Sequence, residues 1–498
     1  MKKILIVAVY CLLNAQTISA QWTVDSLAQN RYGMISAVVG SKAVFTNGSA
    51  YDIYNFATAQ WSSGNLLLQC INTQIATAGD KVYIAGGRIG PYTDPVSVNY
   101  VNVYNSTTNT WNKLPKLSQA RSVGAAASVG TKVIFAGGIV VLSYSKRVDM
   151  FDVNTGVRTT SNLSQARHSI SVATSETKVV FAGGEYGTIG SPVSSNKVDI
   201  YDDATGLWST ALLSVKRQYM GAAAVGNKIL FAGGLRNTAI GGYTSNRVDI
   251  YDVTSGTWSI ASLSQAKYSM AVAVSGSKAY FAGGVMTNGT LSNRVDIYDA
   301  LTNTWSYVTL SSPHMGMAVG ITPGRILFAG GTTFWGNTGT KRVDALNLNT
   351  NTWYVDSLSQ PRLGIGSASY GNQCVFMGGN VVSSWYPIYT IPSKRIDLWT
   401  DIFPRTEFNT DVVINSFLIY PNPANANSIN IHFANPLFNT SEMFIYDLGG
   451  NLVLTKTLEQ NSDRVEGIDI SDLSNGEYLI IIETENNGPI TGRFLIQK

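Results

Sequence analysis

Pairs of adjacent glycines recur along most of this 498-residue chain, each at the end of a short apolar run. Successive pairs lie 46 to 51 residues apart, and a degraded copy at Asn47-Gly48 precedes them. The intact pairs are Gly86-Gly87, Gly137-Gly138, Gly183-Gly184, Gly233-Gly234, Gly283-Gly284, Gly330-Gly331 and Gly378-Gly379. A period of this length predicts a repeat protein in which each copy must stack on its neighbours to bury a core.

Each copy continues after its glycine pair in the same order. In one copy, residues 247–252 read RVDIYD, and a turn at Gly256 and then Trp258 follow. The segment before the pair is rich in small residues, as at 221–224 and 124–127. Small side chains suit the innermost strand of a wedge of four strands. The 47 glycines and 13% charged residues also favour an all-β fold of short strands and tight turns.

The glycine pair, the tyrosine of the third strand and the tryptophan of the fourth resemble the kelch repeat. The resemblance covers about residues 22–400 and implies a kelch-type β-propeller, although Arg158 occupies the tryptophan position of its copy. The last copy ends after its third strand at residues 395–399, and residues 22–27 match the fourth-strand residues 353–358. We therefore expect the N-terminal strand to complete the last blade. Eight blades are favoured, and seven would also suit the family.

The N-terminus predicts export. Residues 1–20 combine two lysines, an apolar segment and a final Ala20, which is the pattern of a cleaved Sec signal peptide. No later segment approaches the ~18 apolar residues that a membrane helix needs, so no membrane span is predicted. Loss of Cys11 with the signal leaves Cys70 and Cys374. These two fall in different blades, so we expect them to be unbonded.

The C-terminal part of the chain has a different pattern. The propeller is expected to span residues 21–403, and a polar linker at 404–416 leads to alternating strands that predict a small antiparallel β-sandwich at 417–498. Four segments resemble, in order, the motifs of the type IX (Por) secretion sorting domain: 417–424, 444–450, 476–482 and 493–498. The resemblance implies recognition by the type IX translocon after Sec export to the periplasm. The domain would then be removed, and the protein released or attached to the cell surface.

Charge is divided unequally between the two parts. The net charge of +4 is the sum of +2 in residues 1–20, +8 in residues 21–416 and −6 in residues 417–498. The basic propeller favours an anionic partner. No nucleic-acid partner is predicted.

The sequence contains no recognisable catalytic motif. The histidines after residue 20 are His168, His314 and His432, too few for a kelch copper site. Metalloprotease, phosphate-loop and nucleophile-elbow motifs are absent from the sequence. The sequence therefore predicts no catalytic residue, no metal site and no cofactor.

One set of equivalent positions is cationic. The residue sixteen positions before each glycine pair is Arg or Lys in six of eight copies and His in a seventh, with Cys70 in the eighth. Equivalent positions of a propeller form a ring, and this one opens the first strand, so we expect it at one mouth of the central channel. The predicted ligand-binding residues are Arg31, Arg121, Arg167, Arg217, Lys267, His314 and Arg362. The alternative is a structural ring whose cations bind backbone carbonyls.

A second periodic set lies on the third strand, where an acid follows a cation by two residues, as in Arg247 and Asp249. Alternation places the two on one face, where cross-strand pairing explains them, so we expect a structural role for both. The acidic positions are Asp52, Asn102, Asp149, Asp199, Asp249, Asp296, Asp344 and Asp397. The cations before them are Arg147, Lys197, Arg247, Arg294, Arg342 and Arg395.

These observations favour a secreted or cell-surface binding protein whose ligand is an acidic glycan or an acidic protein segment. One alternative is a carbohydrate-active enzyme such as a sugar-acid mutarotase. It would need an acid/base near the ring, for which Glu176 and Glu185 are the non-repeating carboxylates near strand ends. The other alternative is a structural adhesin, which would show no preference for charge.

Overall fold

The structure is a computed structural model that describes residues 21–401 and 417–496 with internal gaps. The gaps are 91–94, 239–240, 334–338, 386–387, 421–423, 425–426, 434–440, 448–450, 460–463 and 484–489. The expected signal peptide at 1–20 and linker at 404–416 lie outside the described residues. The described residues are all-β, as predicted, and the chain divides into two compact units, Met1–Phe403 and Pro404–Lys498.

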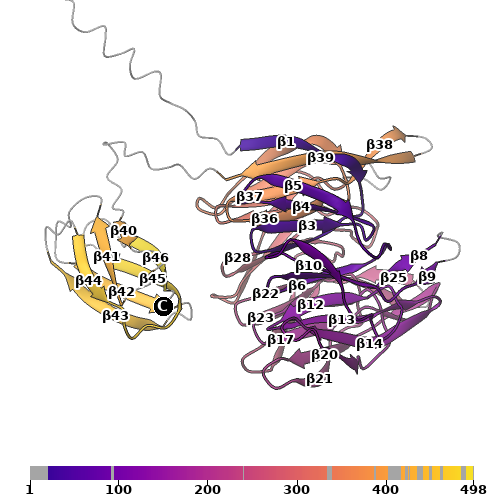
Figure 1. The fold of residues 1–498 in the computed structure, drawn as a ribbon, viewed down its shortest axis with the longest axis horizontal. Helices are drawn as coiled ribbons and strands as arrows, with labels where there is room; N and C mark the ends of the chain where they lie inside the picture. The colour runs from indigo at the N-terminus through magenta and orange to yellow at the C-terminus, as the bar shows by residue number, and fades with distance from the viewer. Residues whose placement is uncertain are drawn as a thin grey trace, which may run out of the picture. The chain divides into compact units, whose positions relative to one another are not determined.

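The first unit is built from sheets of four antiparallel strands, one sheet for each sequence copy. The small-residue segments form the first strands: β2 (Ile35–Val39), β6 (Gln74–Ala78), β12 (Ala125–Val129), β16 (Ser171–Thr174), β22 (Gly221–Val225), β28 (Ala271–Ser275), β32 (Ala318–Thr322) and β36 (Gly366–Tyr370). Each first strand contacts the next, and β36 contacts β2, so these strands close a ring. Figure 1 shows the sheets stacked one after another around this unit.

The remaining strands of each sheet follow outward in sequence order. The second strands end at the glycine pairs: β3 (Lys42–Thr46), β7 (Lys81–Ala85), β13 (Lys132–Val140), β17 (Lys178–Ala182), β23 (Lys228–Ala232), β29 (Lys278–Ala282), β33 (Arg325–Ala329) and β37 (Gln373–Met377). The third strands are β4 (Ala50–Asn55), β10 (Val101–Asn105), β14 (Ser143–Asp152), β20 (Lys197–Asp202), β26 (Arg247–Asp252), β30 (Arg294–Asp299), β34 (Thr340–Asn347) and β39 (Ile388–Thr400). The fourth are β5 (Gln60–Asn65), β11 (Thr110–Lys113), β15 (Arg158–Asn162), β21 (Leu207–Leu212), β27 (Trp258–Ser262), β31 (Thr304–Thr309), β35 (Thr352–Arg362) and β1 (Gln21–Arg31).

The N-terminal strand completes the last sheet, which confirms the predicted closure. β1 pairs antiparallel with β39, and Trp22 lies opposite Trp399. The two indole rings pack edge to face at 5.0 Å, and Trp22 Nε1 donates a hydrogen bond of 2.8 Å to Asp356. The outer strand of this blade is therefore joined both to its own sheet and to the preceding blade.

Neighbouring blades are held together by aromatic packing, as the repeat predicts. Within several sheets the phenylalanine of the second strand stacks on the tryptophan of the fourth, for example Phe181 on Trp208 at 6.0 Å, and this face packs on the preceding blade. Rings of neighbouring blades also meet directly, as Tyr51 and Trp111 do at 4.7 Å. Burial of such rings between sheets removes a large apolar area from water. At Arg158 the tryptophan is missing, and the guanidinium instead donates to the backbone carbonyl of Lys116.

Short hairpins extend from the ends of several second strands. They are β8 (Arg88–Ile89) with β9 (Val96–Ser97), β18 (Glu185–Thr188) with β19 (Ser191–Ser194), and β24 (Leu235–Thr238) with β25 (Gly241–Thr244). β13 and β14 continue as one longer hairpin, and β38 (Asn380–Trp385) pairs with β39. We call this end of the propeller, where first strands begin and second strands end, the ring face. The opposite end is the far face.

The second unit contains two antiparallel sheets. One has the order β40 (Phe417–Tyr420), β41 (Ser428–Phe433), β44 (Arg464–Asp469), and the other β43 (Leu452–Leu458), β42 (Ser441–Asp447), β45 (Gly476–Glu483), β46 (Ile490–Ile496). Their buried side chains form one apolar cluster that includes Ile431, Ile445, Ile480 and Phe494. The unit thus has a core of its own.

Candidate functional site

The predicted ring exists, but its cations are buried. Arg121, Arg167, Arg217, Lys267, His314 and Arg362 are 0% exposed, and Arg31 is 7% exposed. The expectation of an open cationic mouth is therefore corrected, because each side chain points into its own blade.

Arg121 shows where each side chain goes. Its guanidinium donates hydrogen bonds to the carbonyls of Gly137 and Phe135 at 2.9 and 3.1 Å, at the end of the second strand. It also pairs with Asp149 of the third strand at 2.8 Å. The carbonyls were anticipated by the structural alternative, but the aspartate was not.

The same ion pair recurs in every copy that has Arg or Lys at the ring position. The partners are Arg31 with Asp52, Arg167 with Asp199, Arg217 with Asp249, Lys267 with Asp296 and Arg362 with Asp397. His314 occupies the same place, with Nδ1 3.7 Å from Asp344 Oδ2. The sequence predicts cross-strand pairing and a structural role for these aspartates, and in the structure their partners are the ring residues that precede the first strand. The pleat gives both side chains the same face, but Asp149 turns toward the buried Arg121.

Each ring residue also joins two blades. Its backbone carbonyl accepts a hydrogen bond from the second glycine of the preceding copy, such as Gly87 N to Arg121 O at 2.9 Å. The aspartate adds a further link, because Asp149 Oδ1 accepts from the backbone N–H of Ser118 at 2.7 Å. The ring residue and its aspartate therefore join two segments of one blade: the loop that leads into the first strand, and the sheet itself.

The second copy supplies a sequence signal for this pairing. Cys70 replaces the cation there, and Asn102 replaces the aspartate. Asn102 still caps the entering loop through Leu68 N and O, while Cys70 Sγ donates to Gly86 O at 3.2 Å. The cation and the aspartate are thus replaced together. This indicates that the two side chains form a pair without net charge, which we call the neutral unit, and that neither contacts a ligand.

Burial shapes the electrostatics of the ring. It lowers the pKa of Arg217 and of Arg362 to about 10, against the opposing effect of Asp249 and Asp397. Both guanidinium groups therefore stay charged at neutral pH. Burial also lowers the pKa of His314 from 6.5, so that its imidazole is neutral at pH 7.

A second circle of cations remains accessible on the ring face. The outer belt consists of six cations of the third strands, which lie beside the glycine pairs: Arg147, Lys197, Arg247, Arg294, Arg342 and Arg395. All six are partly or fully exposed, and among the described residues no ion pair joins them to a carboxylate. Their charge also lowers the pKa of neighbouring ring cations, as Arg395 does for Arg362 after the larger effect of burial.

The far face is electrostatically different. There, lysines that begin second strands pair with aspartates at the ends of third strands or just beyond them. The pairs are Lys132 with Asp203, Lys178 with Asp202, Lys228 with Asp252 and Lys278 with Asp299. The other cations that begin second strands there, Lys42, Lys81 and Arg325, bond to carbonyl, amide or phenol oxygens. Among the described residues, more cations without a carboxylate partner therefore lie in the outer belt than at these far-face positions.

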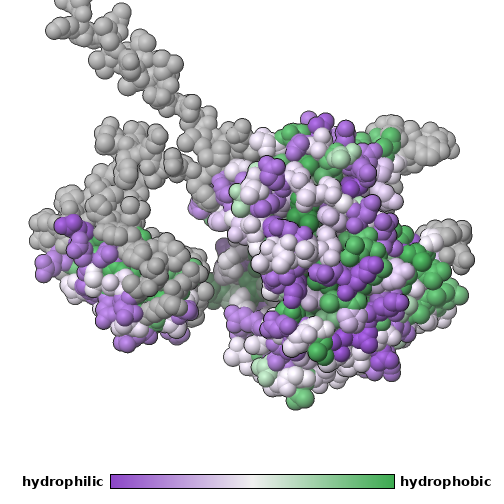
Figure 2. Space-filling model, in the orientation of Figure 1, coloured by the Kyte–Doolittle hydropathy of each residue, from purple (hydrophilic) through white to green (hydrophobic). Residues whose placement is uncertain are grey.

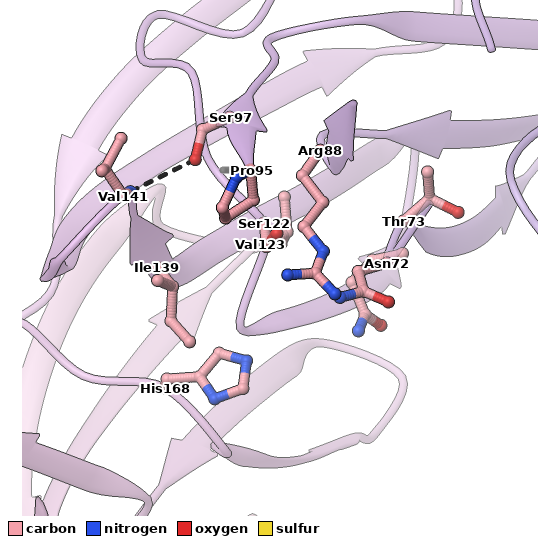
Figure 3. Close-up of a pocket in the computed structure, with 11 residues that line it drawn as sticks. Asn72, Thr73, Arg88, Pro95, Ser97, Ser122, Val123, Ile139, Val141 and His168 are labelled. Atoms are coloured by element: carbon pink, nitrogen blue, oxygen red, sulfur yellow. Dashed lines mark hydrogen bonds between the residues drawn. The ribbon is translucent and has the colours of Figure 1, made fainter. Parts of the chain in front are cut away.

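Two pockets open at the ring face. One, of about 360 Å³, is lined by Asn72, Arg88, Ser122, His168 and their neighbours. Figure 3 shows Arg88 and His168 directed toward the same space, with Ser97 bonded to the backbone of Val141 at its rim. The other, of about 650 Å³, includes Arg395 of the outer belt.

The rim of the first pocket is partly apolar. Ile89, Val96, Val141 and Leu142 are exposed on the hairpins that border it. Figure 2 shows apolar surface in the region of β8 and β9. Sequence reasoning did not anticipate this rim, because the hairpins vary from copy to copy.

A polar cluster adjoins the same pocket. His168 Nδ1 lies 3.6 Å from Glu185 Oε1, and Tyr144 is hydrogen-bonded to Glu185. Burial, together with the charge of Glu185, raises the pKa of Tyr144 to about 12. Of the two carboxylates considered for catalysis, Glu185 lies at the ring face, and Glu176 lies in a first-to-second strand turn of the far face.

Two other kinds of site are absent from the part of the chain that the structure describes. No group of three or more His, Cys, Asp or Glu side chains there could hold a metal ion. No helix in the described ranges is long and apolar enough to cross a membrane.

Comparison with known families identifies both units. Residues 70–118, 216–262 and 266–309 match the kelch motif, and residues 418–497 match the secretion system C-terminal sorting domain. The kelch and type IX resemblances are therefore confirmed. A sorting domain of this kind implies export by the type IX system, to the cell surface or the medium, and interaction with its machinery.

Individual relatives are distant. An F-box/kelch-repeat protein of Arabidopsis thaliana is 35% identical over 86 residues, which is 17% of this chain and 21% of that protein. The chain thus spans about a fifth of the length of this curated relative. The solved structure of YjhT is 17% identical, with a TM-score of 0.40, and the match covers 58% of this chain and 95% of YjhT.

Proposed function

We propose that this exported kelch protein, with its type IX sorting domain, binds a polyanionic ligand at the ring face of its propeller. The ligand class is the one that the sequence predicts, an acidic glycan or an acidic protein segment. The residues differ, because the outer belt takes the place of the buried ring.

The observation that carries this proposal is the outer belt without carboxylate partners. Each buried Arg or Lys of the ring is matched by its own aspartate, so the ring adds little net charge. Six belt cations at one end are then uncompensated and repel one another until an anion approaches. Exposed charges are screened over ~8 Å at physiological salt, so an extended ligand that follows the belt gains more than a single ion.

The test compares charge removal at the two faces. We expect Lys197→Gln, Arg247→Gln and Arg342→Gln together to weaken binding of poly-glutamate and of polygalacturonate by ~1.5 to 3 kcal/mol for each charge-assisted hydrogen bond removed. The matched control is Lys178→Gln, Lys228→Gln and Lys278→Gln, which removes the same charge from the far face. Affinity is measured by calorimetry at two salt concentrations.

Equal weakening in the two triple variants would mean that net charge alone attracts the polymer, and would contradict a site at the ring face. Absence of binding by the unmodified protein would remove the proposed function altogether. Binding that does not fall with added salt would also count against it.

One observation favours a second candidate, a carbohydrate-active enzyme. The carboxylate of Glu185 lies 3.6 Å from Nδ1 of His168 and is hydrogen-bonded to Tyr144 beside a pocket. A carboxylate in this position can exchange protons with a sugar. Glu185→Gln would then abolish catalysed anomer exchange of a sugar acid, measured by NMR, without affecting the binding of poly-glutamate. Exchange at the uncatalysed rate with the unmodified protein would eliminate this candidate.

A further inference from the structure

The residue two positions after each ring position adopts a left-handed backbone in most copies. In the described chain, positive φ angles occur at Gly33, Asn72, Ser169, Tyr219, Ser269, Gly316 and Gly364. Glycine, asparagine and small polar residues tolerate this conformation, whereas a bulky side chain is strained in it. Tyr219, with φ of 53°, is the bulky exception.

Packing does not account for Tyr219. Its side chain is 44% exposed at the ring face, so much of its apolar area is not buried by the fold. Its ring lies 6.4 Å from that of Tyr268, which belongs to the next copy. The two aromatic faces form an exposed platform between neighbouring blades. Strain at an exposed bulky residue points to a role in binding.

Hydrogen-bonding groups surround this platform. Tyr219 lies near enough to Tyr144 to contribute to its raised pKa, after burial and Glu185. Tyr144 is hydrogen-bonded to Glu185, and Glu185 lies 3.6 Å from His168. His168 lines the first pocket, so the platform and the pocket are linked through these residues. Arg236 on β24 is exposed and close enough to Arg217 to lower its pKa slightly, after burial and other charges.

This combination selects one class of ligand. The exposed face of Tyr219, with the Tyr268 ring inclined to it by 38°, suits the C–H face of a sugar ring, and a carboxylate, imidazole and phenol suit its hydroxyl groups. The carboxylate of Glu185 disfavours an anion at its own position, so the anionic group must lie toward Arg236 and the outer belt. A peptide made of acidic residues alone, such as poly-glutamate, offers neither the apolar ring face nor the hydroxyl groups.

We infer that the polyanion of the proposed function is a glycan, and that Tyr219 and Tyr268 stack against one of its sugar rings while Glu185 accepts hydrogen bonds from its hydroxyl groups. This inference rests on the proposed function. It adds a saccharide subsite spread over four consecutive blades.

The experiment separates sugar recognition from charge recognition. Calorimetry measures the affinity of the purified protein for polygalacturonate, an anionic glycan, and for poly-glutamate, an anion without sugar. We expect Tyr219→Ser to weaken polygalacturonate binding at least tenfold and to leave poly-glutamate binding unchanged. Tm should stay equal or rise, because serine adopts the same conformation at Ser169 and Ser269.

The matched control is Tyr370→Ser, which removes a tyrosine of 45% exposure at the far face. It should leave both affinities unchanged. Equal weakening of both polymers by Tyr219→Ser, no weakening of either, or a drop in Tm would overturn the saccharide subsite and leave the outer belt intact. Failure of both polymers to bind the unmodified protein would instead overturn the proposed function, and the subsite with it.

Discussion

Nη1 of Arg121 lies 2.8 Å from Oδ2 of Asp149, and neither side chain has any exposed surface. The pair lies where a chain enters one blade and contacts the glycine pair of the blade before it. Two opposite charges removed from water together are tolerated only when each has its hydrogen-bond partners. The carbonyls of Gly137 and Phe135 and the N–H of Ser118 supply them.

Removing one member of such a pair should destabilise the propeller strongly. We expect Arg121→Ala to lower the free energy of unfolding by about 3 to 5 kcal/mol, because the buried Asp149 would lose its partner at 2.8 Å and keep only the partly exposed Arg158 at 3.8 Å. Arg247→Ala in the outer belt, which is partly exposed, should change it by about 0.5 kcal/mol or less. Urea unfolding measures both. Similar destabilisation in the two variants would show that the ring contributes no more to stability than the surface.

Removing both charges should cost less than removing one. The double variant Arg121→Cys and Asp149→Asn copies the natural pair of Cys70 and Asn102. It leaves no unpaired buried charge and keeps an amide to cap the entering loop. We expect it to regain about 2 kcal/mol relative to a variant with Arg121→Cys alone. Additive effects in this double-mutant cycle would contradict the neutral-unit interpretation.

Loss of the N-terminal strand should open the last blade. Deletion of residues 21–30 would expose the edge of β39 and remove the packing of Trp22 on Trp399. We expect a markedly lower Tm or aggregation, because an unpaired edge strand recruits other chains. Replacing only Val24, which is exposed, by Thr is the control. An unchanged Tm after the deletion would refute closure by β1.

Alkaline pH should weaken the fold. Burial raises the pKa of Cys70 and Cys374 from 9.0 to about 12. The unfolded thiols ionise near pH 9 while the folded ones stay protonated, so their stabilising contribution is complete below pH 9 and is lost as the pH rises toward 12. Urea midpoints at pH 8 and 10.5 should show the fall. The Cys70→Ala, Cys374→Ala variant should show a smaller one, and an equal fall would contradict this assignment.

The sorting domain should be needed for export and not for folding of the propeller. Its buried residues form a separate cluster, and the chain divides after Phe403. A protein ending at Phe403 should therefore retain the propeller Tm in calorimetry. In a bacterium with a type IX system it should fail to reach the surface or the medium. Export without the domain, or failure to fold, would show that the two units depend on each other.

The repeat predicted backbone placement well and side-chain direction poorly. Glycine spacing, small first-strand residues and the match of residues 22–27 to a fourth strand follow from backbone periodicity, and the structure confirms closure by β1. Cys70 and Cys374 are unbonded, as expected. The rotamer of Arg121 depends on a partner 28 residues away. Periodicity gives the position of that arginine in the ring but does not state whether it faces the channel or the sheet.

The candidate site was harder to foresee for a different reason. The outer belt was visible in the sequence as a periodic set. A structural role was predicted for it, and the sequence did not show that its cations remain accessible. Tyr219 and Glu185 do not recur in the other copies of the repeat. A function can be inferred for such a residue only when its backbone angle and its neighbours are known. The joint replacement at Cys70 and Asn102 was the one sequence signal that linked the two charged sets.

Pairing of β1 with β39 also determines the order in which parts of the propeller can fold. The first strand of the propeller cannot find its partner until the chain extends through β39, so closure is a late event with a large loop to organise. Until then the last blade lacks its outer strand and the ring stays open. The sorting domain follows β39 in the chain, so every strand needed for closure is already present when that domain is complete. An N-terminal strand that closes the ring thus couples completion of the fold to the arrival of the export signal.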